Sequence, residues 1–131
     1  MNIRTSDFSD IYFEPASRLL TMTWNKESQK LDEAGVKLEI GRIVEYIRQY
    51  SVKHVIIDSR NYFFRNNSAI QTWITHTYMA QIMDSGVLKY AIIVNSEIIP
   101  QVKGDHDADE EVLPVVDYFT EVEEAKKWIL K

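Results

Sequence analysis

The sequence of 131 residues contains no cysteine. This absence excludes disulfide bonds, thiolate nucleophiles and cysteine-ligated metal sites. Only four glycines are present, and they cannot be assembled into a P-loop or a dinucleotide-binding fingerprint. No apolar run approaches the ~18 residues of a membrane span, and no signal segment precedes the first apolar run. We therefore expect a cytoplasmic protein with no cofactor and no membrane span.

Positive charge is also in short supply, because 15 basic residues face 20 acidic ones and the net charge is −5. A chain of this balance has no general attraction to nucleic acid or to an anionic membrane. The apolar share of 45% and the charged share of 27% are those of a globular protein. The length predicts one domain, residues 1–131, that can bury its own core.

Two apolar runs lie at the centre of the expected fold. Val55, Ile56 and Ile57 show no alternation with polar residues, and residues 88–94 (LKYAIIV) form a second run of this kind. Such runs are typical of strands that helices cover on both faces, as in a parallel sheet. Helical patterns flank the first run on both sides, which predicts an α/β fold in which the two strands are central parallel neighbours.

A β-hairpin is expected near the N-terminus. Residues 11–13 and 19–24 favour strands, and residues 14–18 with Pro15 favour the turn between them. Residues 25–30 are polar and predict a loop. Asp32 then has the character of a helix N-cap, and Val36, Ile40, Ile43, Val44 and Ile47 recur at helical spacing after it.

The second half of the chain predicts three further helices and, besides residues 88–94, one more strand. Ser68-x-x-Gln71 has the form of a capping box before a helix over residues 69–84, which Gly86 closes. A short helix over residues 96–103 and an acidic loop over 104–111 follow. Pro114 places the last strand, residues 112–119, at a sheet edge or puts the proline at the strand's start. Thr120-x-x-Glu123 is a second capping box, before a terminal helix.

The expected order is therefore β-β-α-β-α-β-(α)-β-α. Alternation of strands and helices predicts a mixed, mainly parallel sheet with right-handed crossovers, in which one hairpin strand runs antiparallel.

No catalytic or metal-binding motif stands out. The chain lacks a G-x-S-x-G elbow, a paired-carboxylate motif and a local Ser-His-Asp arrangement. His54, His76 and His106 share no ligand spacing. Residues 105–109 imitate the opening of a calcium loop, but Glu110 and Val116 stand where glycine and glutamate are needed. We expect no enzyme activity and no metal, although residues distant in sequence can meet in a fold.

Several stretches share a likeness to one family: the hairpin ending at Trp24, the helix ending near Tyr50, HVIIDSRN, a tryptophan-containing helix, YAIIVN and FTEVEEAKKWIL. Together they resemble the STAS-like (SpoIIAA-like) family of small bacterial proteins, many of them STAS/SEC14-type domains. The resemblance implies a non-enzymatic regulatory or protein-interaction module. The SEC14-like relatives imply an alternative, a small apolar ligand held between helices and sheet.

The resemblance also points to Ser68. Regulatory STAS domains carry a serine at the start of the second helix that a partner kinase phosphorylates, typically within Asp-Ser-Ser-Gly. Here Asn66-Asn67-Ser68-Ala69 occupies that place, without the acid, the first serine or the glycine. Capping alone explains a serine at a helix start, so Ser68 is interpreted as an N-cap, with a phosphosite as the alternative.

A possible binding surface follows from the residue types. Asp58 stands beyond the end of a parallel strand, where α/β sheets bind ligands, although an aspartate there also orders loops. Tyr62, Phe63 and Phe64 form a binding lip or pack over the sheet edge. The helix over 69–84 carries more apolar residues than one core face needs. Trp73, Tyr78 and Met79 on it predict a homodimer, a bound apolar molecule or ordinary core.

Overall fold

A six-stranded sheet forms the centre of the computed structural model, which describes residues 1–96 and 113–131. The described strands lie in the sheet in the order in which they occur along the chain. They are β1 (Asn2–Thr5), β2 (Ser9–Glu14), β3 (Leu19–Trp24), β4 (His54–Asp58), β5 (Lys89–Ile93) and β6 (Val115–Phe119). The predicted α/β class is confirmed.

The sheet is mixed in the predicted way. β2 pairs antiparallel with both β1 and β3, whereas β3, β4, β5 and β6 pair in parallel. Only β2 therefore runs against the other described strands. The two apolar runs are parallel neighbours, with Ile56 opposite Ala91. β6 is the last described strand and begins directly after Pro114, as the proline indicated.

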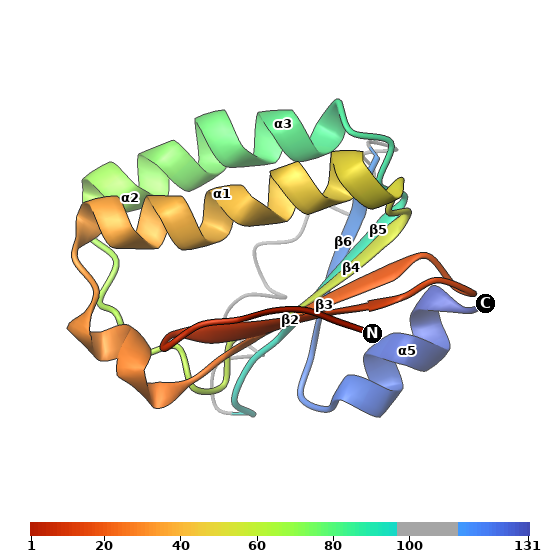
Figure 1. The fold of residues 1–131 in the computed structure, drawn as a ribbon, viewed down its shortest axis with the longest axis horizontal. Helices are drawn as coiled ribbons and strands as arrows, with labels where there is room; N and C mark the ends of the chain where they lie inside the picture. The colour runs from red at the N-terminus through yellow and green to blue at the C-terminus, as the bar shows by residue number, and fades with distance from the viewer. Residues whose placement is uncertain (97–112) are drawn as a thin grey trace.

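Helices cover both faces of this sheet. The described helices are η1 (Lys26–Lys30, 3-10), α1 (Glu33–Tyr50), α2 (Ser68–Trp73), η2 (Ile74–Tyr78, π), α3 (Met79–Met83) and α5 (Val122–Ile129). We call α2, η2 and α3 together the second helical segment. Figure 1 shows α1 and this segment on one face of the sheet and α5 on the other. Among the described residues, no helix is both long and apolar enough to cross a membrane.

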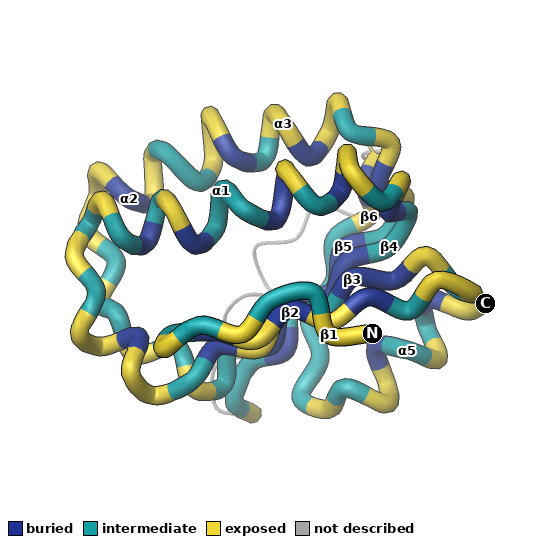
Figure 2. Tube along the Cα trace, viewed as in Figure 1, coloured by how far each residue is buried: buried dark blue, intermediate teal, exposed yellow. Residues whose placement is uncertain are grey.

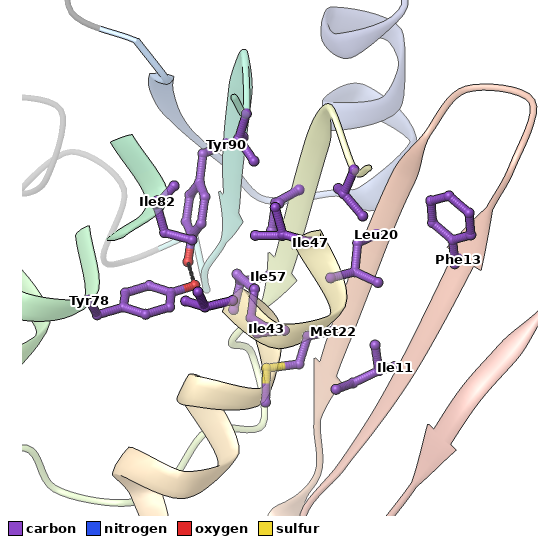
Figure 3. Close-up of a cluster of buried hydrophobic side chains, with 14 of the residues drawn as sticks. Ile11, Phe13, Leu20, Met22, Ile43, Ile47, Ile57, Tyr78, Ile82 and Tyr90 are labelled. Atoms are coloured by element: carbon purple, nitrogen blue, oxygen red, sulfur yellow. Dashed lines mark hydrogen bonds between the residues drawn. The ribbon is translucent and has the colours of Figure 1, made fainter. Parts of the chain in front are cut away.

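Each face has its own core. The larger cluster lies between the sheet and the helices α1 to α3, and includes Leu20, Ile43 and Ile82 (Figure 3). The smaller lies against α5 and includes Ile56, Ala91 and Ile129. Figure 2 shows the buried positions gathering along the strands and along the sheet-facing sides of the helices. This two-sided burial explains the unbroken apolar run in β4.

The strand β1 was not predicted. It has one apolar residue, Ile3, and it is tied down by a polar contact with α1. Arg4 Nη1 and Nη2 each lie 3.0 Å from a carboxylate oxygen of Glu39, which is buried. Ser9 Oγ also donates to Glu39 Oε2 at 2.9 Å, and Ser9 is fully buried. Glu39 thus accepts hydrogen bonds from both ends of the turn between β1 and β2.

Helix starts were predicted with mixed success. Asp32 caps α1, because its Oδ1 accepts from the Gly35 N–H at 2.7 Å. Ser68 is not the cap of the second helix. Asn67 fills that role, accepting from the Ile70 N–H at 2.9 Å, and Ser68 is the exposed first helical residue. Thr120 is likewise not a cap, since α5 begins after Glu121, whose side chain makes no capping hydrogen bond.

Two further predictions concern loops. The loop expected over residues 25–30 is a 3-10 helix, η1, whose start Asn25 caps through its side chain. The short helix expected over residues 96–103, apart from its first residue, and the acidic loop over 104–111 lie outside the described residues.

The second helical segment contains a π-turn that explains its broad apolar surface. Ile70, Ile74, Tyr78 and Ile82 are four residues apart, and on an α-helix of ~100° per residue each step drifts by about 40°. In η2 the Met79 N–H instead bonds to the Ile74 carbonyl, five residues back. This wider turn resets the register, so Ile70, Tyr78 and Ile82 are all buried. Most of the excess apolar surface therefore belongs to the core.

Candidate ligand-binding site

A cavity of about 280 Å³ lies between the helices and the carboxyl-terminal half of the parallel strands. Its apolar wall comes from five elements: Met22 of β3, Ile57 of β4, Ile92 of β5, Ile40 and Ile43 of α1, and Ile74 of η2. Figure 3 shows Met22, Ile43 and Ile57 pointing into the space between sheet and helices. The carboxyl ends of parallel strands are the usual place for ligands in open α/β sheets.

The polar part of the lining consists of hydroxyl and amide groups. It comprises Ser59, Asn66, Gln71, Tyr62, Tyr78, Tyr90 and Tyr118. Gln71 is exposed, and Tyr62 and Asn66 are half-buried, which places these three toward solvent. Tyr78 and Tyr90 are buried and form the inner part of this polar set. The cavity thus has an apolar body and a polar, solvent-facing side, as small-molecule sites commonly do.

Tyr62 closes part of the cavity from the loop of residues 59–67. Its ring lies 4.7 Å from that of Trp24, the last residue of β3, at an interplanar angle of 52°. Its hydroxyl donates to Asn66 Oδ1 at 2.6 Å, which closes the loop on itself. Burial raises the pKa of Tyr62 to about 12, so its hydroxyl stays protonated at neutral pH.

Ser28 of η1 holds the same loop from the other side. Its Oγ accepts from the Phe63 N–H at 2.8 Å and donates to the Asn61 carbonyl at 3.2 Å. Ser28 itself is fully buried, whereas its two bonds are partly buried because Asn61 and Phe63 are exposed. This residue was missed because its segment reads as a plain polar loop, and no local pattern links it to a loop some thirty residues away.

Asp58 orders the start of this loop. The Arg60 Nε and Nη2 atoms lie 3.0 and 2.7 Å from its two carboxylate oxygens, and the Arg60 N–H bonds to Oδ1 at 3.2 Å. The hydrogen bond to Asp58 raises the pKa of the Arg60 guanidinium. Asp58 itself is buried and does not line the cavity. Its geometry matches the loop-ordering interpretation.

Two buried tyrosines meet deep in the site. The hydroxyls of Tyr78 and Tyr90 lie 2.8 Å apart, and their rings meet edge to face at 6.4 Å (Figure 3). Burial raises the pKa of both groups well above the usual value. One hydroxyl therefore donates to the other, and neither carries charge at neutral pH.

The remaining predicted surface residues separate into two groups. Trp73 and Met79 are half-buried and pack against the larger core, and Trp73 stacks on Tyr78 at 6.1 Å. Lys37 Nζ lies 5.9 Å from the centre of the Trp73 ring. Phe64 is half-buried beside Tyr62, at 6.4 Å between ring centroids, whereas Phe63 is 49% exposed. Of the predicted surface, only Tyr62 and Tyr78 line the cavity.

Several lining residues had no signal in the sequence. Trp24, Tyr90 and Tyr118 lie on three different strands, and Asn66 and Gln71 flank a helix start. Each has an ordinary structural interpretation when it is taken alone. Trp24 and Tyr118 lie near the carboxyl ends of their strands, whereas Tyr90 is the second residue of β5, so strand position could have joined only the first two.

The titratable side chains of the described residues form no metal site. Among these residues, no three His, Asp or Glu side chains are grouped as metal ligands. His54 lies at the start of β4, at the opposite end from the cavity, and burial followed by the Lys89 charge lowers its pKa. His76 is exposed on η2, and His106 lies outside the described residues.

Comparisons of the chain with models of protein families, with curated proteins and with solved structures found no match. The likeness to the STAS-like family therefore stays a prediction, which rests on the stretches of sequence that suggested it.

Proposed function

We propose that this protein binds a small apolar molecule in the cavity between α1, η2 and strands β3 to β6. The observation that supports the proposal is the lining itself, which combines apolar side chains from sheet and helices with a few polar groups at one side. Concave sites of this composition are the usual small-molecule sites of proteins. The site is also where the SEC14-like alternative places its ligand.

The size of the cavity limits the ligand. About 280 Å³ lies just below the range of ~300–1,000 Å³ that is typical of ligand pockets. One ring system or one short chain fills such a space, whereas a two-chain lipid does not. The proposal is therefore a carrier or sensor of a small molecule, with the ligand position of SEC14-like proteins but a smaller ligand.

Hydrogen bonds within the chain hold the loop that borders the cavity. Ser28 and Asp58 fix the loop of residues 59–67 through five hydrogen bonds to Arg60, Asn61 and Phe63. A site that is already formed loses less entropy when a ligand binds. This rigidity favours a binding role over a loop that only covers the core.

A filled cavity tests this proposal. Ile40 lines the cavity from α1, and Leu38 on the same helix is 64% exposed. We expect wild type and Leu38→Trp to take up 1-aminoanthracene, a neutral apolar dye, with a rise in fluorescence. We expect Ile40→Trp to lose that uptake while circular dichroism shows that it is folded.

A second variant protects the test against misfolding. Gln71→Trp places the same bulk at the exposed side of the cavity, where it does not disturb the core. Loss of dye uptake in Gln71→Trp and its retention in Leu38→Trp support the proposal. Equal uptake by all of these variants, or none by the wild type, would contradict it.

One observation favours a second candidate, a STAS-like interaction module controlled at Ser68. Because Asn67 caps the helix, the exposed Ser68 is free of the capping role and accessible to a kinase. A phosphoryl group in the first turn is also favoured by the helix dipole. Intact-mass analysis of the protein from its native host would show a phosphoryl group that Ser68→Ala lacks. An unmodified mass under all growth conditions would contradict this role.

We propose that the partner of such a module is a second copy of the same chain. Met83, Leu88, Leu113 and Val115 are each exposed by 42–53%, and the Val115 N–H bonds to the Leu88 carbonyl. Trp73 and Met79, which the sequence suggested for this contact, pack instead against the core. A sedimentation experiment over a wide concentration range tests for a homodimer, and Leu88→Glu should then shift it to monomer.

A further inference from the structure

The described residues that line the cavity carry no charge. Among the described residues that line it, none is Asp, Glu, Lys, Arg or His, although 27% of the chain is charged. We propose, resting on the function above, that the ligand is an uncharged aromatic molecule bearing one hydrogen-bonding group such as a carboxamide. Fatty acids and other anions are then excluded by chemistry rather than by size.

The described residues of the inner wall offer no counter-ion to an ionic ligand. The Tyr78 and Tyr90 hydroxyls are 2.8 Å apart and bond to each other, and both residues are buried. An ionised carboxylate or ammonium beside them would lose its hydration without gaining a counter-ion. Burial of an unpaired charge is costly, and such groups neutralise instead. The wall therefore discriminates against both signs of charge.

The aromatic side chains fit a ring. Trp24 and Tyr62 meet at 4.7 Å with their planes inclined by 52°, and Tyr78 and Tyr90 meet edge to face. All four rings line the cavity. Aromatic groups prefer such tilted and offset contacts, which an aromatic ligand can continue and a flexible chain cannot. The ring of the ligand is therefore expected against this cluster.

The solvent-facing side supplies neutral donors and acceptors. Asn66 Oδ1 accepts from the Tyr62 hydroxyl, which leaves the two amide hydrogens of Asn66 as donors. Gln71 adds an exposed carboxamide with both donors and an acceptor. A carboxamide or ketone on the ligand matches this pair, because amides bond to one another in both directions. The polar group of the ligand is therefore expected beside Asn66 and Gln71.

Two probes of equal size test the inference. Indole-3-acetamide and indole-3-acetate have the same ring and nearly the same shape, but only the acetate is charged at neutral pH. Isothermal titration calorimetry on the full chain should show the amide binding about tenfold more tightly or better, since only the anion must give up its hydration unpaired. The ring they share cancels in this comparison.

A variant adds the missing charge. Gln71→Lys places a cation at the exposed side of the cavity, so the acetate should gain affinity and the preference for the amide should fall or reverse. Gln81→Lys makes the same change at an exposed position of α3 that does not line the cavity. The amide preference of this control should stay as in the wild type.

The outcomes separate this inference from the function on which it rests. If the wild type binds the acetate as tightly as the amide, or takes up the 1-aminoanthracene dye but neither indole compound, the inference is overturned and the apolar site stands. An unchanged preference in Gln71→Lys also overturns it. If dye and both indole compounds fail to bind, the proposed function itself is wrong.

Discussion

The two faces of the sheet differ in the side chains that they bury. Against α5, the buried side chains are small or aliphatic, and Ile56, Ala91 and Ala125 among them are fully buried. Against α1 and η2, larger side chains surround a cavity and include the paired hydroxyls of Tyr78 and Tyr90. Both faces belong to the same strands. The α5 face thus buries aliphatic side chains, whereas the opposite face contains the cavity that we propose as a binding site.

On the α5 face, Lys89 of β5 contacts the C-terminal end of the helix. Lys89 Nζ donates to the Trp128 carbonyl at 2.8 Å and lies 5.3 Å from the centre of the Trp128 ring. The Phe119 ring meets the same tryptophan at 5.4 Å. A cation at a helix C-terminus satisfies the last carbonyls and suits the dipole. The side-chain hydrogen bond to this helix of eight residues is thus at its C-terminus. In α1 and α2 the side-chain caps are at the N-terminus.

The largest expected effect is on the free energy of unfolding, and it compares the packing of the two faces directly. Ile56 points to the α5 face and is fully buried, while its neighbour Ile57 lines the cavity. Ile56→Ala should lower the free energy of unfolding by about 3–4 kcal/mol, because it opens a new void. Ile57→Ala only enlarges the existing cavity. It should cost about 2 kcal/mol, close to the free energy of transferring the lost methyl groups from water to an apolar interior. Urea unfolding measures both, and equal losses would mean that the two faces are equally well packed.

A smaller effect is expected where the cavity face is tied to the sheet edge. Glu39→Gln removes the charge that accepts from Arg4 and Ser9, and should cost roughly 2–3 kcal/mol, as for hydrogen bonds to charged groups. Glu45→Gln removes a charge from an exposed position of the same helix and is the control. Hydrogen exchange should show β1 opening first in Glu39→Gln. Unchanged protection of β1 would contradict its attachment through Glu39.

The next prediction concerns the start of the second helix. Asn67→Ala should cost about 1 kcal/mol because it removes the capping acceptor of the Ile70 N–H. Ser68→Ala should stay within about 0.5 kcal/mol, as for an ordinary surface position. Thermal unfolding of the two variants compares neighbouring residues of one helix. A larger loss in Ser68→Ala than in Asn67→Ala would restore the cap assignment made from the sequence.

Those two residues show what the sequence could and could not decide. Strands and helices were predictable because their apolar spacing is a local property, as in Val55, Ile56 and Ile57. Asn67 and Ser68 are both good caps, and no local preference separates them. β1 was missed because Glu39, which holds it, lies thirty-five residues away from Arg4. Long-range polar contacts of this kind leave no periodic signal.

The cavity escaped prediction for a related reason. Its lining comes from strands, helices and a loop, so no stretch of sequence contains it. The wide apolar surface of the second helix was noticed, but its cause was not. The π-turn of η2 has no sequence signature of its own, and such turns are frequent at functional sites. The sequence left a homodimer, a bound apolar molecule and ordinary core as explanations of the apolar excess, and in the structure Ile70, Tyr78 and Ile82 belong to the core.

The last prediction sharpens the comparison through the dependence of stability on pH. The pKa of Tyr62 is raised to about 12 by burial, from a usual value of 10.0. The folded state therefore holds this proton more tightly than the unfolded state, and the resulting stability is fully present below about pH 10. It is lost as the pH rises from there through about 12, as the unfolded state gives up its proton.

Tyr62→Phe should reduce the slope of stability against pH in this window without abolishing it, because Tyr78 and Tyr90 on the same face titrate in the same sense. Tyr12→Phe removes a hydroxyl from an exposed residue and serves as the control. Urea unfolding at several alkaline pH values gives these slopes, and an equal slope for the wild type and Tyr62→Phe would mean that Tyr62 is not buried over the cavity.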